Sequence, residues 1–166
     1  MSAFWTYFWP PLGTGLLLGV IAGAFGFRPH ARRTLFLLIG GVAAIGAAAL
    51  WHGPLGAADR FTAEVQRTAR QTLVDYEMSK VQAQLHHGPL TRRLILSGPA
   101  DDFQSSELVR IMGDLPGVSV AQWSNKGSGV PLIVEGAAMA MLGFLIGLLL
   151  AYLVELRRRY NAQWNW

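Results

Sequence analysis

Few side chains could bind a metal ion or carry acid–base chemistry, and most of them lie in the middle of the chain. His86 and His87 are the best candidates for nitrogen ligands. Neighbours in an extended chain point to opposite faces, however, so the pair is poorly placed to hold one metal ion. The following Gly88-Pro89 predicts a solvated turn instead. Cysteine is absent, which excludes thiolate ligands, cysteine nucleophiles and disulfides.

The carboxylates show no clearer catalytic pattern. Asp101 and Asp102 precede a predicted helix, where capping and the helix dipole account for both. Asp75 and Glu77 have no partner base close in sequence. No arrangement of Ser, His and Asp suggests a triad, and the glycines have neither dinucleotide-binding nor phosphate-loop spacing. We therefore expect a protein that is not an enzyme and has no cofactor or metal site.

The composition indicates a membrane protein. Hydrophobic residues make up 52% of the chain and charged residues 14%, which is too apolar for an ordinary soluble domain. A polar segment, Gly56 to Lys126, separates two apolar regions and carries equal numbers of acidic and basic residues. The excess positive charge lies outside it, in two clusters beside the apolar regions: Arg28, Arg32 and Arg33, and Arg157, Arg158 and Arg159. Such clusters are typical of topology signals, and we expect no nucleic-acid binding.

Three apolar runs are long enough to cross a bilayer, which needs roughly 20 helical residues. The first is uncharged from Phe4 to Phe27 and carries Pro10 and Pro11, which fit a first helical turn. Charge follows this run instead of preceding it, which argues against a cleavable signal peptide. The predicted organisation is a first span with an aromatic N-terminus (1–27), a basic turn (28–33), a second span (34–52), a polar domain (56–124), a linker (125–131), a third span (132–154) and a basic tail (155–166).

Three spans place both arginine clusters on the same side of the membrane. Lys and Arg are enriched on the cytoplasmic side, so we expect the basic turn and the C-terminus in the cytoplasm. The N-terminus and the polar domain then face the periplasm of a bacterium, and the chain is a multi-pass protein of the inner membrane. No charged residue lies deep within a span; Glu135 is nearest, and we place it at the outer interface, with an intramembrane proton relay as the alternative.

Small residues recur at helical spacing in all three spans. Because lipid tails solvate apolar side chains well, helices in a bilayer associate where small residues let backbones approach. The pattern predicts a packed bundle or docking on a larger membrane complex, although glycine and alanine are frequent in any membrane helix. The predicted packing residues are Gly15, Gly19 and Gly23, then Gly40, Ala44 and Ala48, then Gly143 and Gly147.

Within the polar segment the hydrophobic period changes from helix to strand and back. A stripe at i, i+4 spacing predicts an amphipathic helix over Ala57 to Tyr76, followed by alternating strands over Lys80 to Leu85 and Thr91 to Ser97. Asp101 and Gln104 have the spacing of a capping box for a second helix, which Pro116-Gly117 ends. Val118 to Trp123 alternates as a third strand. The predicted fold class is an α-helical membrane protein with three transmembrane helices and a small α+β domain of the order helix, strand, strand, helix, strand. The buried stripe of the first helix should be Phe61, Val65, Ala69, Leu73 and Tyr76, and that of the second Leu108, Ile111, Met112 and Leu115.

This order, with Leu94-Ile95-Leu96-Ser97-Gly98 and later Leu115-Pro116-Gly117-Val118, resembles a BON domain over residues 57–123. BON domains are small modules of bacterial envelope proteins. The resemblance covers none of the spans, and the matching positions are mainly turns and core. It implies an envelope location and binding of phospholipid, cell wall or protein, with no enzyme activity and no transferable binding residue.

Two further sets of residues are candidates for contacts at the surface. Arg92 and Arg93 could meet anionic lipid or an acidic partner, the alternative being a solvated strand face. Tryptophans flank the predicted spans, where amphipathic rings favour the membrane interface, with pigment or cofactor contact as the alternative. These interface anchors are Trp5, Trp9, Trp51, Trp123, Trp164 and Trp166.

Two functions fit this pattern. The first is a non-catalytic accessory or assembly subunit that docks through its glycine-lined helices on a larger inner-membrane complex, an energy-transducing one among the candidates. The second is an envelope-binding module whose periplasmic domain binds phospholipid or peptidoglycan. The expected partners are other membrane-protein subunits and membrane lipid.

Overall fold

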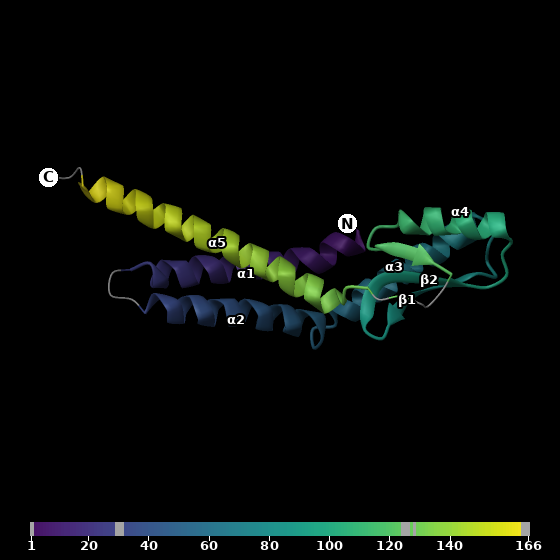
Figure 1. Ribbon diagram of the computed structural model, residues 1–166, viewed down its shortest axis with the longest axis horizontal. Coiled ribbons are helices and arrows are strands. Elements are labelled where there is room, and N and C mark those ends of the chain that lie inside the picture. Colours follow the sequence, from purple (N-terminus) through teal and green to yellow (C-terminus); the bar gives the residue numbers. More distant parts are fainter. Residues whose placement is uncertain (1, 29–31, 124–126, 128, 164–166) are drawn as a thin grey trace. The chain divides into compact units, whose positions relative to one another are not determined.

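The protein is mostly helical, and three of its helices are long and apolar (Figure 1). The computed structural model describes residues 2–28, 32–123, 127 and 129–163. The long helices are α1 (Ala3–Gly26), α2 (Arg33–His52) and α5 (Leu132–Gln163), with mean hydropathies of 1.5, 2.1 and 2.4 in their most apolar stretches. Each is long and apolar enough to cross a membrane. The predicted class, mostly helical with three span-length helices and a small sheet, is confirmed.

The chain divides into two compact units. The helical unit comprises Phe8–Leu55 and Gly136–Trp166, and the sheet unit comprises Met1–Tyr7 and Gly56–Glu135. The first residues of α1 and of α5 therefore belong to the sheet unit and not to the helical one. A domain running from 56 to 124 alone, as the sequence suggested, leaves out these two short segments.

In the helical unit, α1 and α5 run parallel and α2 runs antiparallel to both. Successive glycines of α1 meet successive residues of α5, from Gly15 at Ala140 to Gly23 at Ala151. Gly40 of α2 meets Ala22 of α1, while Phe36, nearer the start of α2, lies beside Gly26. The centre of the unit is a small apolar core of Ala22, Ala44 and Phe144, with Leu18, Met141 and Leu148 packed against it.

The predicted place of Pro10 and Pro11 in a first helical turn is wrong. α1 begins at Ala3, so Pro10 and Pro11 lie inside the helix instead of in its first turn. The hydroxyl of Thr14 donates a hydrogen bond to the Pro10 carbonyl at 2.8 Å, in the turn that follows the prolines. α5 continues to Gln163, past the predicted span 132–154, and Glu155 and Arg159 form an i, i+4 ion pair at 2.9 Å on its polar turns.

The sheet unit has the predicted order of elements: α3 (Ala57–Asp75), β1 (Gln82–His87), β2 (Leu90–Ser97), α4 (Asp102–Gly113) and β3 (Val120–Gln122). β2 is the central strand. It pairs antiparallel with β1, where Leu85 is opposite Leu94, and parallel with β3, where Leu94 is opposite Ala121. α4 is the crossover between the parallel strands. β3 is shorter than the predicted strand.

The core of the sheet unit comes from the predicted stripes, with corrections at their ends. Phe61, Val65, Ala69 and Leu73 of α3 are all buried, as are Leu108 and Met112 of α4 and Leu85, Leu94 and Leu96 of the sheet. Ile111 and Leu115 are only half-buried. Tyr76 is 55% exposed, which contradicts its predicted place in the stripe. It lies just after the last turn of α3, where the next residue, Glu77, adopts a left-handed conformation (φ 59°) and turns the chain away.

The Pro116-Gly117 turn brings the chain against α3. Gly117 has φ +104°, a conformation that side chains with a Cβ rarely adopt, and a Cβ there would lie 3.0 Å from Val65 and 3.2 Å from the ring of Phe61. Glycine is therefore required at this position for two reasons: the positive φ of the turn and the close approach to α3. This contact leads the chain from α4 into β3 beside the core.

Candidate functional site

The two histidines are the last residues of β1, so their predicted place in a solvated turn is wrong: the turn consists of Gly88 and Pro89. His86 Nδ1 is 3.0 Å from the Pro89 carbonyl, across the turn, and His87 is exposed. Among the residues that the structure describes, no group of three or more His, Asp or Glu side chains could hold a metal ion. Asp101 caps α4: its carboxylate accepts from the Gln104 backbone N–H at 2.7 Å, and the Gln104 side chain accepts from the Asp101 N–H. The predicted capping box is confirmed.

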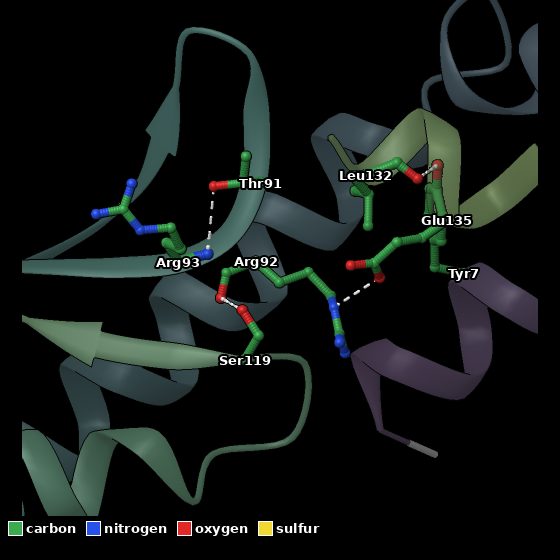
Figure 2. A network of polar contacts seen from close by, with 7 residues as sticks. All are labelled: Tyr7, Thr91, Arg92, Arg93, Ser119, Leu132 and Glu135. Atoms are coloured by element: carbon green, nitrogen blue, oxygen red, sulfur yellow. Dashed lines mark hydrogen bonds and ion pairs between the residues drawn. The ribbon is translucent and has the colours of Figure 1, made fainter. Parts of the chain in front are cut away.

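A polar and aromatic cluster, which we call the Arg92 junction, lies in the sheet unit. It contains Tyr7 from the start of α1, Arg92 from β2, and Leu132 and Glu135 from the start of α5 (Figure 2). Phe4, also from the start of α1, belongs to it as well. Three stretches that are distant in sequence thus meet at one place. None of the sequence patterns predicted that they would.

Arg92 is the central residue of this junction. Its Nε lies 2.7 Å from Oε2 of Glu135, and its guanidinium lies over the ring of Phe4, 5.3 Å from the centroid. The side chains of the pair are only 21% and 24% exposed, so their attraction is less screened than at an open surface. The Arg92 backbone carbonyl accepts bonds from the backbone N–H and the hydroxyl of Ser119, at 2.8 and 3.1 Å, which also tie β2 to the start of β3.

Tyr7 and Glu135 complete the junction. The Tyr7 side chain is buried, its hydroxyl donates to the Leu132 carbonyl at 3.4 Å, and its ring packs against Phe61 of α3 at 5.5 Å. Glu135 lies in the first turn of α5, where a negative charge also interacts favourably with the helix dipole. The sequence did not predict that Glu135 pairs with Arg92. The sequence places Arg92 in a strand next to apolar residues, which suggests that it needs an acidic partner. It does not indicate which carboxylate that partner is.

Arg93 lies on the opposite face of β2. It is 5% exposed, and its Nη1 donates to the carbonyl of Gly127. A Cβ at Gly129 would lie 2.8 Å from the Arg93 side chain, so the segment after β3 covers this arginine. The interpretation of Arg93 as part of a solvated strand face is therefore wrong, because Gly127 and Gly129 lie against its side chain. Pro131 forms an isolated bridge with Thr91. Both Arg92 and Arg93 are engaged within the sheet unit.

The described part of the junction offers ion pairing, ring packing and hydrogen bonding. Its arginine and glutamate neutralise each other, and its tyrosine hydroxyl is engaged with a backbone carbonyl. Such an arrangement can hold three chain segments together.

The eight predicted packing residues all lie in contacts inside the helical unit. A Cβ added at Gly15 or Gly19 would overlap the backbone of α5, at Ala140 and Phe144. In return, a Cβ at Gly143 or Gly147 of α5 would overlap the backbone of α1, at Leu12 and Leu16. Gly23 meets Ala151, Gly40 meets Ala22 and Phe144, and Ala44 and Ala48 are buried.

Comparison with known proteins gives no relative: no family model, no curated protein and no solved structure matches this chain.

The two arginine clusters lie at the same end of the helical unit. Arg159 of α5 donates from Nη2 to the carbonyl of Phe27, at the end of α1, at 2.9 Å. Arg33, in the first turn of α2, lies over the ring of Phe27 at 5.0 Å. Arg28 lies over Phe25 at 5.2 Å. Arg32, Arg157 and Arg158 are exposed.

The predicted interface tryptophans have different surroundings. Trp5 and Trp9 are 47% and 52% exposed, and Trp51 is half-buried near the end of α2. Trp123 is bound within the sheet unit, since its indole N–H donates to the Ser105 carbonyl of α4 at 2.9 Å. Trp164 and Trp166 lie outside the described residues.

Proposed function

We propose that the protein is a non-catalytic accessory or assembly subunit of a larger complex in a bacterial inner membrane. Its three long helices cross the bilayer, with the arginine end in the cytoplasm and the sheet unit in the periplasm. The clustering of Arg28, Arg33 and Arg159 at one end supports this orientation, since basic residues are enriched on the cytoplasmic side.

The observation that carries the proposal is the apolar exterior of the helical unit. Val42 of α2 is 69% exposed and Leu38 is 62% exposed, and Leu145 and Leu149 of α5 are more than half exposed. Side chains of this kind need lipid or another helix around them. The contacts of the Arg92 junction hold segments of the chain together. With this junction and an apolar exterior, the protein fits a role in packing against other subunits and positioning them.

The surface for a partner differs from the one expected from the sequence. The glycines at 15, 19, 143 and 147 are used between α1 and α5, so they do not line an open face. Gly46 of α2 has no atom within 4 Å of an added Cβ and lies among exposed apolar residues such as Val42 and Leu50. We therefore place the docking face on the outer side of α2.

Co-purification tests this function. The full chain, extracted with a mild detergent from its native membrane, should elute in a complex larger than its own micelle, with partner subunits identified by mass spectrometry. Replacing Gly46 with Phe should release it from that complex, whereas Phe at Gly13, which is also open, serves as the matched control. A chain that elutes alone would contradict the proposal. A reporter fused at Lys126 tests the orientation and should be active only in the periplasm.

The second candidate is an envelope-binding module. It is supported by the resemblance of the sequence of residues 57–123 to BON domains and by Phe103, which is 75% exposed in the first turn of α4. The detergent-extracted full chain should then bind cell-wall sacculi or phospholipid vesicles, and Phe103→Ser should weaken that binding. The full chain is needed because Phe4, Tyr7 and Glu135 belong to the sheet unit.

A further inference from the structure

The arginine end of the helical unit contains a pocket of about 320 Å³, within the size range of small-molecule sites. The end of α1 and the start of α2 provide part of its lining, and α5 provides the rest. Its lining residues are Gly26, Phe27, Arg28, Arg33, Tyr152, Glu155, Leu156 and Arg159. Among these described residues, three arginines face a single carboxylate, so the pocket carries excess positive charge.

The contacts of these arginines hold them in place and leave donors for an anion. Arg159 uses Nε for Glu155 and Nη2 for the Phe27 carbonyl, each at 2.9 Å, while a guanidinium has five N–H donors. Arg28 and Arg33 lie over aromatic rings, a contact made by the face of the guanidinium and not by its N–H edge. The one carboxylate in the pocket is already paired.

A second pocket of about 250 Å³ adjoins the first one. The two share Phe27, Arg28 and Glu155, and the second adds Arg158. The rest of its lining is apolar and comes from two facing helices: Val20, Gly23 and Ala24 of α1, and Leu150, Ala151 and Val154 of α5. The combined surface is therefore cationic at the helix ends and apolar along the α1–α5 groove.

We propose that these two pockets form one binding site for an anionic phospholipid. The phosphodiester accepts hydrogen bonds from Arg28, Arg33 and Arg159, and an acyl chain lies along the groove beside Ala24 and Val154. A phosphodiester matches the planar fork of arginine, and the excess positive charge selects lipids of net negative charge over zwitterionic ones. The site rests on the proposed membrane insertion, with the arginine end in the cytoplasmic leaflet.

Lipid retention by the purified full chain tests this site. The chain is reconstituted in vesicles of equal phosphatidylglycerol and phosphatidylcholine, extracted in mild detergent and examined by native mass spectrometry. We expect a preference for phosphatidylglycerol that falls about tenfold in the triple variant Arg28→Lys, Arg33→Lys, Arg159→Lys. Lysine keeps the charge, and with it the topology signal, but loses the planar fork. The control is Arg67→Lys with Arg70→Lys, on the exposed side of α3.

The acyl-chain half of the site has its own variant. Ala24→Phe should fill the groove and weaken retention of phosphatidylglycerol, whereas Ala43→Phe, at an exposed position of α2 outside both pockets, should not. An equal effect of the two substitutions would overturn the assignment of the groove.

Three other results would overturn the lipid site. Equal retention of the two lipids by the wild type would contradict the proposed selectivity for anionic lipid. An unchanged preference in the triple lysine variant would show that positive charge in general, and not the arginine fork, is responsible. Displacement of phosphatidylglycerol by inorganic phosphate at equal concentration would show that the pocket takes the phosphate group alone. Carbonate washing of the vesicles separates this proposal from the proposed function. Release of the chain would overturn both, and retention without lipid preference would overturn only the lipid site.

Discussion

Arg92 of β2 and Glu135 of α5 form an ion pair, with 2.7 Å between Nε and Oε2, that ties the central strand of the sheet to the first turn of the last helix. Phe4, from the first turn of α1, stacks on the same guanidinium. One side chain therefore contacts the beginnings of two long helices. The sheet unit depends on residues that a cut at the edges of the polar segment would remove.

Removing one member of this pair should destabilise the sheet unit. Arg92→Gln or Glu135→Gln leaves a partly buried charge without its partner, and we expect each to cost about 1–2 kcal/mol, with strong coupling in the double variant. Amide hydrogen exchange of β1 and β2 in the full chain measures the local opening free energy. The control is the pair Glu107 and Arg110, which is 2.8 Å apart but has side chains 40% and 71% exposed and should show no measurable coupling. Equal coupling in both pairs would contradict a special role for Arg92.

The close approach of α1 and α5 predicts that alanine substitution destabilises the bundle at Gly15 but not at Gly13. Gly15→Ala drives a methyl group into the Ala140 carbonyl, and we expect a loss of about 1–3 kcal/mol in bundle stability. Gly13→Ala places the same methyl group where no atom lies within 4 Å, and we expect a change of less than about 0.5 kcal/mol. Unfolding by SDS, followed by circular dichroism of the full chain, measures both. Similar losses at the two positions would show that α1 does not pack on α5 through this face.

The capping box of α4 predicts a local effect. Asp101→Ala leaves the Gln104 N–H without its acceptor, and we expect it to cost about 0.5–2 kcal/mol. Asp101→Asn keeps a good cap and should restore most of this stability. Hydrogen exchange in the first two turns of α4 is the measurement. Faster exchange in the asparagine variant as well would point to charge, and not capping, as the cause.

Substitution of Trp123 tests whether this tryptophan stabilises the sheet unit or only anchors the chain at the membrane. Trp123→Phe keeps a ring but removes the donor to Ser105, and we expect faster exchange in α4 and β3, equivalent to about 0.5–1.5 kcal/mol. Trp9→Phe, at a residue that is 52% exposed, should leave these amides unchanged. If Trp123 served only to anchor the chain at the membrane, its replacement would change quenching by brominated lipids and leave the exchange of α4 unaltered.

Local patterns predicted the elements of this protein well. The stripe from Phe61 to Leu73 and the Asp101 capping box depend on residues a turn apart, so the sequence contains the whole signal. Ends were harder to predict: Tyr76 continues the spacing of the stripe, but the left-handed Glu77 has already turned the chain.

Contacts between distant residues were not predictable in the same way. Arg92 could have paired with any exposed carboxylate or with lipid, and only the fold brings Glu135 to it. Arg93 has the composition of a surface residue and is buried because the segment containing Gly127 and Gly129 folds over it. The small residues of the spans indicated close packing, but spacing alone does not say whether the neighbour is another helix of the same chain.

The parallel pairing of α1 with α5 has a consequence for biogenesis. The two glycine faces come from widely separated parts of the sequence. Under the proposed membrane insertion, α1 and α2 would enter the bilayer before α5, which packs against Gly15 and Gly19, has been synthesised. Until α5 is present, the glycine face of α1 is uncovered and can bind another helix, because small residues favour association wherever backbones can approach. Faithful assembly of the bundle then depends on how quickly α5 follows, and a delay in translation would expose a surface that competing helices can occupy.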